Sequence, residues 1–253
     1  MSVRPKKRLG QHFLTDPNTV RRIAEAVDAP TDGRVVEIGP GEGALTGALL
    51  DRYPDLVALE VDPEAVAHLG ARFPGLDVRE GDVLDADWTA LAEGRPLWVV
   101  GNLPYYITSP ILFALLDARA HVARAVVMVQ KEVADRLGAP PGSKTYGTLS
   151  VYFALFAEAR VLFDVSRHCF RPKPAVESAV VALDFGAASG PDVPFAALQR
   201  VVRAAFGQRR KMLRNSLATV AQAAGTEVPD WAATRRPEAV SPDDFVRLAR
   251  HFA

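Results

Sequence analysis

The stretch Gly101–Tyr106, with the sequence Gly-Asn-Leu-Pro-Tyr-Tyr, combines groups that can hold a flat, nitrogen-bearing ring. The Asn102 amide offers both a carbonyl acceptor and an NH2 donor. Pro104 fixes its own φ and holds Leu103 in an extended conformation, which sets the direction of the Leu103 carbonyl. Tyr105 supplies a flat face on which a base can stack. The alternative is a strand end and a turn, in which Asn and Pro serve turn chemistry, and these residues alone leave both interpretations open.

The elements around this stretch alternate between strands and helices, which predicts a mostly parallel sheet with helices on both faces. The predicted strands are 34–38, 56–61, 76–79, 97–100, 122–129, 160–165 and 178–185. The predicted helices are one that Thr15 or Asp16 caps and that runs to about Val27, then 44–52, 63–73, 110–116, 131–137, 195–206, 208–224 and 242–251, while 148–156 fits either a helix or a strand. We expect an α/β domain at 1–186 and a smaller helical domain at 187–253.

A strand–glycine–helix unit at 34–50 is typical of a nucleotide site. Gly39, Gly41 and Gly43 let the backbone approach a ligand and let the helix pack on the strand. The spacing Gly39-x-Gly41-x-x-Ala44 also satisfies a relaxed dinucleotide pattern, so a nicotinamide enzyme is an alternative. That alternative gives no role to Asn102 and lacks an evident acid/base pair.

Acidic side chains follow the next two predicted strands. Glu60 ends the second strand, where its carboxylate can accept hydrogen bonds from both hydroxyls of a ribose. Asp82 follows the third strand and can accept from the amino group of an adenine, although an Asp at this place, taken alone, is more typical of a helix N-cap or a turn. Ligands of open α/β sheets bind at the carboxyl edge of the strands. We therefore expect Glu60, Asp82 and Asn102 to line one site.

The composition of the chain bears on disulfides, membrane attachment and metal binding. The chain has 253 residues, an apolar share of 49% and a single cysteine, Cys169, so no internal disulfide can form. No apolar run approaches the roughly 20 residues that span a bilayer, and no apolar segment follows the basic N-terminus. We expect a cytoplasmic, monomeric protein without membrane attachment. The His and Cys residues show no metal-ligand spacing, so no metal is expected.

Charge is balanced overall but clustered locally. Thirty basic and thirty acidic residues give a net charge of zero, so any nucleic-acid binding must come from patches. One patch lies in the arm Arg4–Arg8 and another in the run Arg200–Arg214, which contains no acid. The residues we predict to contact phosphates are Arg203, Arg209, Arg210, Lys211, Arg214, Lys144 and Lys173. On a continuous helix, three of these arginines, at 203, 210 and 214, lie on a similar face; the alternative is a solvated face.

Seven motifs occur in the order found in the ribosomal RNA adenine dimethyltransferases, and the chain resembles the small-subunit, KsgA type of that family most closely. They are Gln11-His12-Phe13-Leu14, Glu37-Ile38-Gly39-Pro40-Gly41, Glu60-Val61-Asp62, Gly81-Asp82, Gly101-Asn102-Leu103-Pro104-Tyr105, Gln130-Lys131-Glu132-Val133 and Phe170-Arg171-Pro172-Lys173-Pro174-x-Val176-x-Ser178. The similarity covers nearly the whole chain, including the helical tail. His12 departs from the family pattern, in which many members carry Asn.

This resemblance implies a Rossmann-like, seven-stranded fold of the S-adenosylmethionine-dependent methyltransferase class, with a C-terminal helical RNA-binding domain. The residues implied in binding S-adenosylmethionine are Gln11, His12, Leu14, Glu37, Gly39, Gly41, Gly43, Glu60, Val61, Asp82, Val83 and Asn102. The residues implied in holding the target adenine are Asn102, Leu103, Pro104, Tyr105 and Phe170. Phe170 would cover the base on the face opposite Tyr105, and its alternative is core packing.

The implied reaction is N6,N6-dimethylation of adenosines in small-subunit ribosomal RNA during ribosome biogenesis. The Asn102 oxygen and the Leu103 carbonyl would accept hydrogen bonds from the adenine N6, so no catalytic histidine is required. The implied partner is the small ribosomal subunit. Two alternatives remain: an Erm-type enzyme that methylates large-subunit RNA, and a non-catalytic assembly factor with the same fold.

Overall fold

The computed structural model describes residue 6 and residues 10–186 and 190–253, so Arg4, Lys7 and Arg8 of the basic arm lie outside the described residues. The chain divides into two compact units: residues up to Ala134 with Arg160–Gly186, and Asp135–Ala159 with the residues from Ala187 to Ala253. This differs from the predicted boundary, because 135–159 belong with the C-terminal helices. The Tyr146 hydroxyl donates to the Val240 carbonyl at 2.8 Å, and the Gly142 N–H donates to the Glu238 carbonyl at 2.7 Å.

The first unit is built on a seven-stranded sheet with the order β4-β3-β2-β5-β6-β9-β7. Its strands are β2 (Arg34–Ile38), β3 (Val57–Glu60), β4 (Asp77–Glu80), β5 (Leu97–Asn102), β6 (Val122–Gln130), β7 (Glu158–Val165) and β9 (Ser178–Asp184). The four pairs from β4 to β6 are parallel, and β9 pairs with β6 antiparallel. The predicted mostly parallel sheet of seven strands is confirmed.

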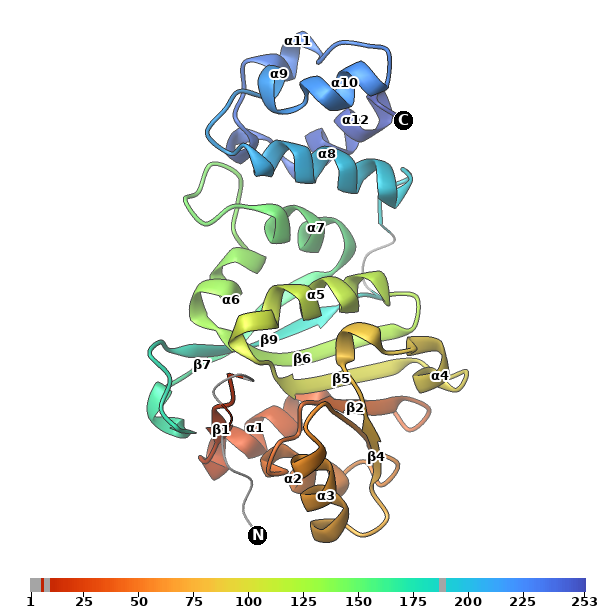
Figure 1. The fold of residues 1–253 in the computed structure, drawn as a ribbon, viewed down its shortest axis with the longest axis vertical. Coiled ribbons are helices and arrows are strands. Elements are labelled where there is room, and N and C mark those ends of the chain that lie inside the picture. The colour runs from red at the N-terminus through yellow and green to blue at the C-terminus, as the bar shows by residue number, and fades with distance from the viewer. Residues whose placement is uncertain (1–5, 7–9, 187–189) are drawn as a thin grey trace. The chain divides into compact units, whose positions relative to one another are not determined.

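Helices cover both faces of this sheet. The helices of the unit are α1 (Pro17–Val27), α2 (Ala44–Leu50), α3 (Pro63–Arg72), α4 (Trp88–Ala92) and α5 (Thr108–Asp117), and α6 (Lys131–Leu137) follows β6. Figure 1 shows α1, α2 and α3 on one face and α5 on the other. Asp16 caps α1 by accepting from the Thr19 N–H at 2.8 Å, which selects it over Thr15 as the N-cap. All five residues of β2 are buried, as expected of a central strand with helices on both faces.

A second, two-stranded sheet was not predicted from the sequence. β1 (Phe13–Leu14) pairs antiparallel with β8 (Phe170–Arg171), with Phe13 opposite Arg171. Two-residue strands carry no periodic pattern, so no sequence signal marks them. The pairing nevertheless brings the segment before Phe13, which lines the site described below, close to the loop after β7.

The second unit is helical. It contains α7 (Thr148–Phe156), α8 (Phe195–Gly207), α9 (Leu213–Ser216), α10 (Ala218–Ala223), α11 (Asp230–Ala233) and α12 (Pro242–His251). Its core includes the fully buried Tyr146, Tyr152, Phe153 and Phe245. The segment 148–156, which the sequence left open, is a helix.

The basic run does not form the continuous helix predicted at 208–224. After α8, residues 208–211 form a turn and bend, and helix resumes only at Leu213. Arg203 therefore lies on α8, Arg210 in the turn and Arg214 on α9, so the prediction that they share one helix face is wrong. The lengths of the helices also bear on membranes: none among residues 10–186 and 190–253 is both long and apolar enough to cross one.

Candidate active site

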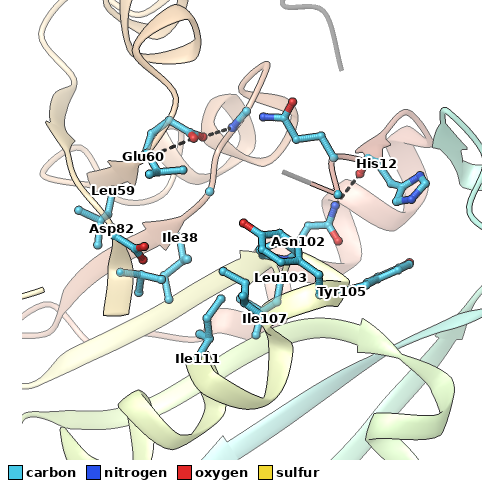
Figure 2. A pocket seen from close by; sticks show the side chains of 18 of the residues that line it. His12, Ile38, Leu59, Glu60, Asp82, Asn102, Leu103, Tyr105, Ile107 and Ile111 are labelled. Atoms are coloured by element: carbon cyan, nitrogen blue, oxygen red, sulfur yellow. Dashed lines mark hydrogen bonds between the residues drawn. The ribbon is translucent and has the colours of Figure 1, made fainter. Parts of the chain in front are cut away.

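A pocket opens at the carboxyl ends of the parallel strands in the first unit (Figure 2). Its walls come from the segment before β1, from the glycine turn after β2 and from the segments that follow β3, β4 and β5. The lining residues are Gly10, Gln11, His12, Phe13, Ile38, Gly39, Gly41, Leu59, Glu60, Val61, Gly81, Asp82, Val83, Asn102, Leu103, Pro104, Tyr105, Tyr106, Ile107 and Ile111. The expected convergence of Glu60, Asp82 and Asn102 on one site is therefore observed.

Glu60 is a buried carboxylate at the base of the pocket, with 3% of its surface exposed. One of its oxygens accepts from the Gly41 N–H, and the other accepts from the N–H groups of Val61 and Asp62, each at 3.0 Å. Burial raises the pKa of Glu60, and the three backbone donors limit that rise. The two backbone donors on Oε1 occupy both of its lone-pair directions, whereas Oε2 accepts only one and keeps a second lone pair, so the group can still accept a hydrogen bond from a ligand.

The glycine turn after β2 leaves the pocket open. Gly39 has φ +62°, and no atom lies within 4 Å of the place where its Cβ would be. A side chain there would be strained and would project into free space at the pocket wall. Gly41 has φ +56°, and a Cβ on it would lie 2.7 Å from the Phe13 ring. The turn therefore presents bare backbone to the pocket, as the sequence predicted.

Asn102 is the last residue of β5, and its amide is held in one orientation. The Nδ2 group donates to the His12 carbonyl at 2.8 Å, a bond drawn in Figure 2. Among the described residues no donor reaches its Oδ1. The next residue, Leu103, is fixed through its own N–H, which donates to the Met128 carbonyl at 3.0 Å. The β5 end therefore presents a fixed amide oxygen at the pocket.

Tyr105 lies half-buried at the same corner of the pocket. Its hydroxyl and the Ser178 hydroxyl are 2.6 Å apart and share a hydrogen bond, and Ser178 is fully buried. Burial raises the pKa of the Tyr105 phenol, so the group stays neutral. The His12 ring stacks on the Tyr105 ring with centroids 5.5 Å apart and an interplanar angle of 29°. Figure 2 shows the Tyr105 side chain extending away from Glu60 and Asp82, toward His12.

His12 joins three parts of this corner. Its carbonyl holds Asn102, its ring stacks on Tyr105, and its Nδ1 lies 2.7 Å from the Pro172 carbonyl, to which it donates. Gln11 lies beside it in the pocket lining, and its side-chain oxygen accepts from the Lys6 N–H at 2.8 Å. Lys6 also pairs with Asp62 at 2.6 Å. The sequence analysis placed Lys6 only within the basic arm Arg4–Arg8, as a candidate for RNA contact, and did not predict its pairing with Asp62.

Asp82, Val61 and Val83 line the opposite side of the pocket. Asp82 caps the short helix Val83–Asp85 by accepting from the Leu84 N–H at 2.9 Å. The N-cap alternative is therefore real, but only one carboxylate oxygen is used, and the residue still faces the pocket. Both predicted uses of Asp82 are compatible with one side chain.

Four predicted site residues do not line this pocket. Glu37 and Leu14 line a smaller cavity beside it, and Gly43 packs against Phe73. Phe170 is 5% exposed and lies in the core cluster with Leu14, where packing against apolar neighbours satisfies its ring. That these four touch a ligand stays a prediction, and for Phe170 the apolar surroundings favour the core-packing alternative.

Glu37 also has a structural role, which the sequence did not predict. It is buried in the middle of the sheet, and its Oε2 accepts from the Thr46 hydroxyl at 2.6 Å. Burial, with a smaller contribution from the nearby Glu60 carboxylate, raises the pKa of Glu37 to about 8. Glu37 is therefore mostly protonated at neutral pH.

Several lining residues were missed by the sequence analysis. Ile107 and Ile111 form part of the wall and belong to η3 (Tyr105–Ile107) and α5. Tyr106 lies at the mouth with 56% of its surface exposed. Gly10, just before the Gln-His-Phe-Leu motif, lies against the Tyr106 ring, since a Cβ on it would be 3.0 Å from that ring. Apolar wall residues resemble ordinary core residues in sequence, so only Tyr106 had a signal, as an aromatic directly beside the motif.

The predicted phosphate-binding residues lie outside the pocket. Lys173 is exposed in the first unit, in the loop after β8, with its Nζ 3.3 Å from His168 Nε2. The others belong to the second unit. Arg209 is held by Glu238 at 3.1 Å and by the Lys144 carbonyl at 2.8 Å. The side chains at 203, 210, 211 and 214 are exposed, and within residues 190–253 and the rest of the described chain they form no ion pair.

The first unit has a Rossmann-like α/β sheet, and at one edge of this sheet lie a glycine turn, an acidic strand end and an Asn-Leu-Pro-Tyr segment. These features define an enzyme of the methyltransferase class, which uses a nucleotide cofactor. The comparisons with known proteins agree. Residues 3–252 match the model of the family described as ribosomal RNA adenine dimethylase. The chain belongs to the ribosomal RNA adenine dimethylase family.

Two relatives are similar over nearly their full lengths. The Ribosomal RNA small subunit methyltransferase A of Salinibacter ruber is 50% identical over 98% of this chain and 85% of its own length. The protein of the same name from Xanthomonas oryzae pv. oryzae is 46% identical over 96% of this chain and 95% of its own length.

Two solved structures resemble the whole chain. A dimethyladenosine transferase from Plasmodium falciparum matches with a TM-score of 0.78 and 25% identity, over 95% of this chain and 97% of that one. The 23S rRNA methyltransferase ErmE matches with a TM-score of 0.67 and 28% identity, over 95% of this chain and 99% of that one.

Proposed function

We propose that this protein transfers methyl groups from S-adenosylmethionine to the N6 of adenosines in small-subunit ribosomal RNA, giving N6,N6-dimethyladenosine during ribosome biogenesis. The observation that carries the proposal is the Asn102 amide, whose NH2 is bound by the His12 carbonyl while its oxygen stays free of protein donors at the pocket. Family membership and the relatives named for the small subunit support the choice of reaction.

The pocket fits S-adenosylmethionine. Gly39 leaves open space at the wall, Glu60 offers a buried carboxylate oxygen, and Asp82 offers a carboxylate on the same side of the pocket as Glu60. Glu60 would accept from a ribose hydroxyl through its Oε2, and Asp82 would accept from the adenine amino group. Gln11, His12, Val61 and Val83 complete the lining. When bound, the cofactor supplies an electrophilic methyl group on a sulfonium.

The protein's contribution to the reaction is mainly positioning and electrostatics. The N6 lone pair of adenine is delocalised into the ring, which makes N6 a weak nucleophile. The Asn102 oxygen and the Leu103 carbonyl each accept one N6–H and thereby orient the amino group. The hydrogen bond from Asn102 to His12 keeps the amide from rotating to present its NH2 instead.

The second transfer places a different demand on the same two acceptors. After one methyl group has been added, N6 carries a single N–H, so only one acceptor remains paired. The adenine must then be held mostly by contacts with its ring. Tyr105 supplies such a contact, since the Ser178 hydroxyl fixes the position of its ring. Pro104 lines the pocket directly before it.

Exposed Lys and Arg side chains would bind the phosphates of the RNA outside the target base. The proposal gives this task to Lys144, Arg203, Arg210, Lys211 and Arg214 in the helical unit and to Lys173 in the first unit, all of which are exposed. Arg209 is included as a weaker contributor because Glu238 already neutralises it. A cytoplasmic location would follow from ribosomal RNA as substrate, and the monomeric state stays a prediction.

Labelled methyl transfer to under-methylated small subunits and, separately, to large subunits tests the proposed function. We expect label on the small subunit alone, recovered as N6,N6-dimethyladenosine when the modified base is mapped. Label on the large subunit alone would establish the Erm-type alternative, which ErmE, at 28% identity, represents among the similar structures. Binding of small subunits without any transfer would establish the non-catalytic assembly factor.

A further inference from the structure

Tyr106 is an aromatic side chain that the pocket leaves open to solvent. It is 56% exposed, and the only other lining residue among the exposed large apolar side chains of the described chain is Val61. No hydrogen bond among the described residues involves its hydroxyl. Gly10 lies against one edge of the ring, and because Gly10 has no side chain it does not cover the ring.

The neighbouring Tyr105 provides the contrast. Both tyrosines belong to η3 and both line the pocket. The Tyr105 hydroxyl is held by Ser178, and its ring is stacked by His12. Two adjacent residues of one type therefore have opposite surroundings: Tyr105 is held by the protein, whereas the Tyr106 ring is available to a ligand.

The strand order places Tyr106 on the side of the pocket where the target base is proposed to bind. Asn102 ends β5, and Leu103 and Tyr106 come after it. Glu60 ends β3 and Asp82 comes after β4, and both of these strands lie on the other side of β2. The half of the pocket with the two carboxylates is assigned to the cofactor. The exposed Tyr106 ring therefore lies in the half of the pocket that is left for the RNA.

The substrate RNA offers a base that can stack on the Tyr106 ring. An enzyme that modifies a base must take that base out of its stack, and the adjacent base then loses one stacking partner. An exposed aromatic side chain replaces that partner and accepts any base, because every base has a π-face. We propose that Tyr106 is a stacking platform for the nucleobase adjacent to the target adenosine. This inference rests on the proposed function and adds a second base-binding subsite to it.

The first experiment measures equilibrium binding of under-methylated small subunits by Tyr106→Ala, Tyr106→Phe and Tyr106→Trp proteins. Loss of one base stack predicts binding weakened roughly 5- to 100-fold in Tyr106→Ala, with Phe and Trp close to wild type. Val161→Ala, which removes another exposed apolar side chain of the same unit, should bind as wild type does. Affinity for S-adenosylhomocysteine should be unchanged in all four.

A second experiment asks whether the lost contact is a base. Short single-stranded RNAs with one central adenosine, and with the base removed on the 5′ or the 3′ side in turn, are used as competitors. Removing the base on one side should weaken competition for wild type but not for Tyr106→Ala. Equal weakening in both proteins, or in neither, overturns the inference.

The outcomes separate this inference from the proposed function. If the wild-type protein transfers methyl groups and Tyr106→Ala binds small subunits normally, the stacking platform is refuted and the proposed function stands. A parallel loss of S-adenosylhomocysteine affinity in Tyr106→Ala also refutes it, because the ring would then belong to the cofactor site. A binding defect in Tyr106→Ala beside a wild type that transfers no methyl group refutes the proposed reaction and leaves the platform standing.

Discussion

The polar groups in the pocket of the first unit are fixed by hydrogen bonds, whereas most of those in the basic segment of the helical unit, Arg209–Arg214, are exposed and, within the described part of the chain, unpaired. In the pocket, Glu60 and Asn102 are each fixed by hydrogen bonds from or to the backbone, and Tyr105 is fixed by Ser178. In the basic segment, Arg210, Lys211 and Arg214 are exposed, without an ion pair among the described residues.

This difference matches two kinds of task. A reaction that depends on positioning needs acceptors fixed to within a fraction of an ångström, whereas phosphate contacts act through charge and tolerate movement. Arg209 is the exception in the basic segment, because Glu238 and the Lys144 carbonyl hold it. The comparison therefore predicts large, localised effects in the pocket and smaller, salt-dependent effects in the basic segment.

The largest effect is expected for Asn102→Ala, which removes the fixed acceptor. We expect kcat for methyl transfer to fall on the order of 10²- to 10³-fold, the cost of removing a comparable electrostatic contact to a reacting group. Binding of S-adenosylmethionine, measured by calorimetry, should stay within a few-fold of wild type. Full activity in this variant would refute the role assigned to Asn102.

In the basic segment, replacing Arg210, Lys211 and Arg214 together with Ala should weaken small-subunit binding roughly tenfold or more at low salt. The slope of log affinity against log salt should become shallower by about two to three. Arg209→Ala is the matched control, since its charge is already paired, and it should change the slope least. An unchanged slope in the triple variant would mean that these side chains form only a solvated face.

The hydrogen bond between Tyr105 and Ser178 should have an intermediate effect. Ser178→Ala and Tyr105→Phe should each lower kcat by about 5- to 10-fold, as expected for one lost hydrogen bond. The double variant should be no worse than either single variant, because both changes remove the same bond. Ser178→Thr retains the hydroxyl and should recover activity. Additive losses would show that the two residues act separately.

The smallest effect concerns stability at the buried Glu37. Its folded pKa of about 8 lies above its ordinary value of 4.5, so between these values the native state binds a proton that the unfolded state has released. The free energy of unfolding therefore falls as pH rises from about 4.5 to 8, by at most a few kcal/mol.

Chemical denaturation of wild type and Glu37→Gln at several pH values measures this contribution. The variant should lose less stability over that range, although the raised pKa of Glu60 contributes in the same direction and remains. Exchange of the exposed Glu25 for Gln is the control and should leave the wild-type pH dependence in place. A steeper fall in Glu37→Gln would contradict the assignment of a protonated Glu37.

The sequence by itself determined the sheet, the family and the residues at the strand ends. Alternating apolar runs and helices specify a parallel sheet, and a parallel sheet brings its carboxyl ends to one edge. Glu60, Asp82 and Asn102 were therefore located without coordinates. The sequence did not decide whether 148–156 is a helix or a strand, and it did not predict the turn within the basic run Arg200–Arg214. The reason is that propensity does not show which helix packs on which, nor where a chain turns.

Only the tertiary structure decided which groups are free to act. It paired β1 with β8 across more than 150 residues of chain and so brought His12 to Asn102 and Tyr105. It buried Phe170 in the core and left Tyr106 open. Such outcomes depend on contacts between residues distant in sequence, which no local pattern records. The Gly-Asn-Leu-Pro-Tyr-Tyr stretch indicated a base-binding site. The fold then fixed Tyr105 through Ser178 and left Tyr106 exposed.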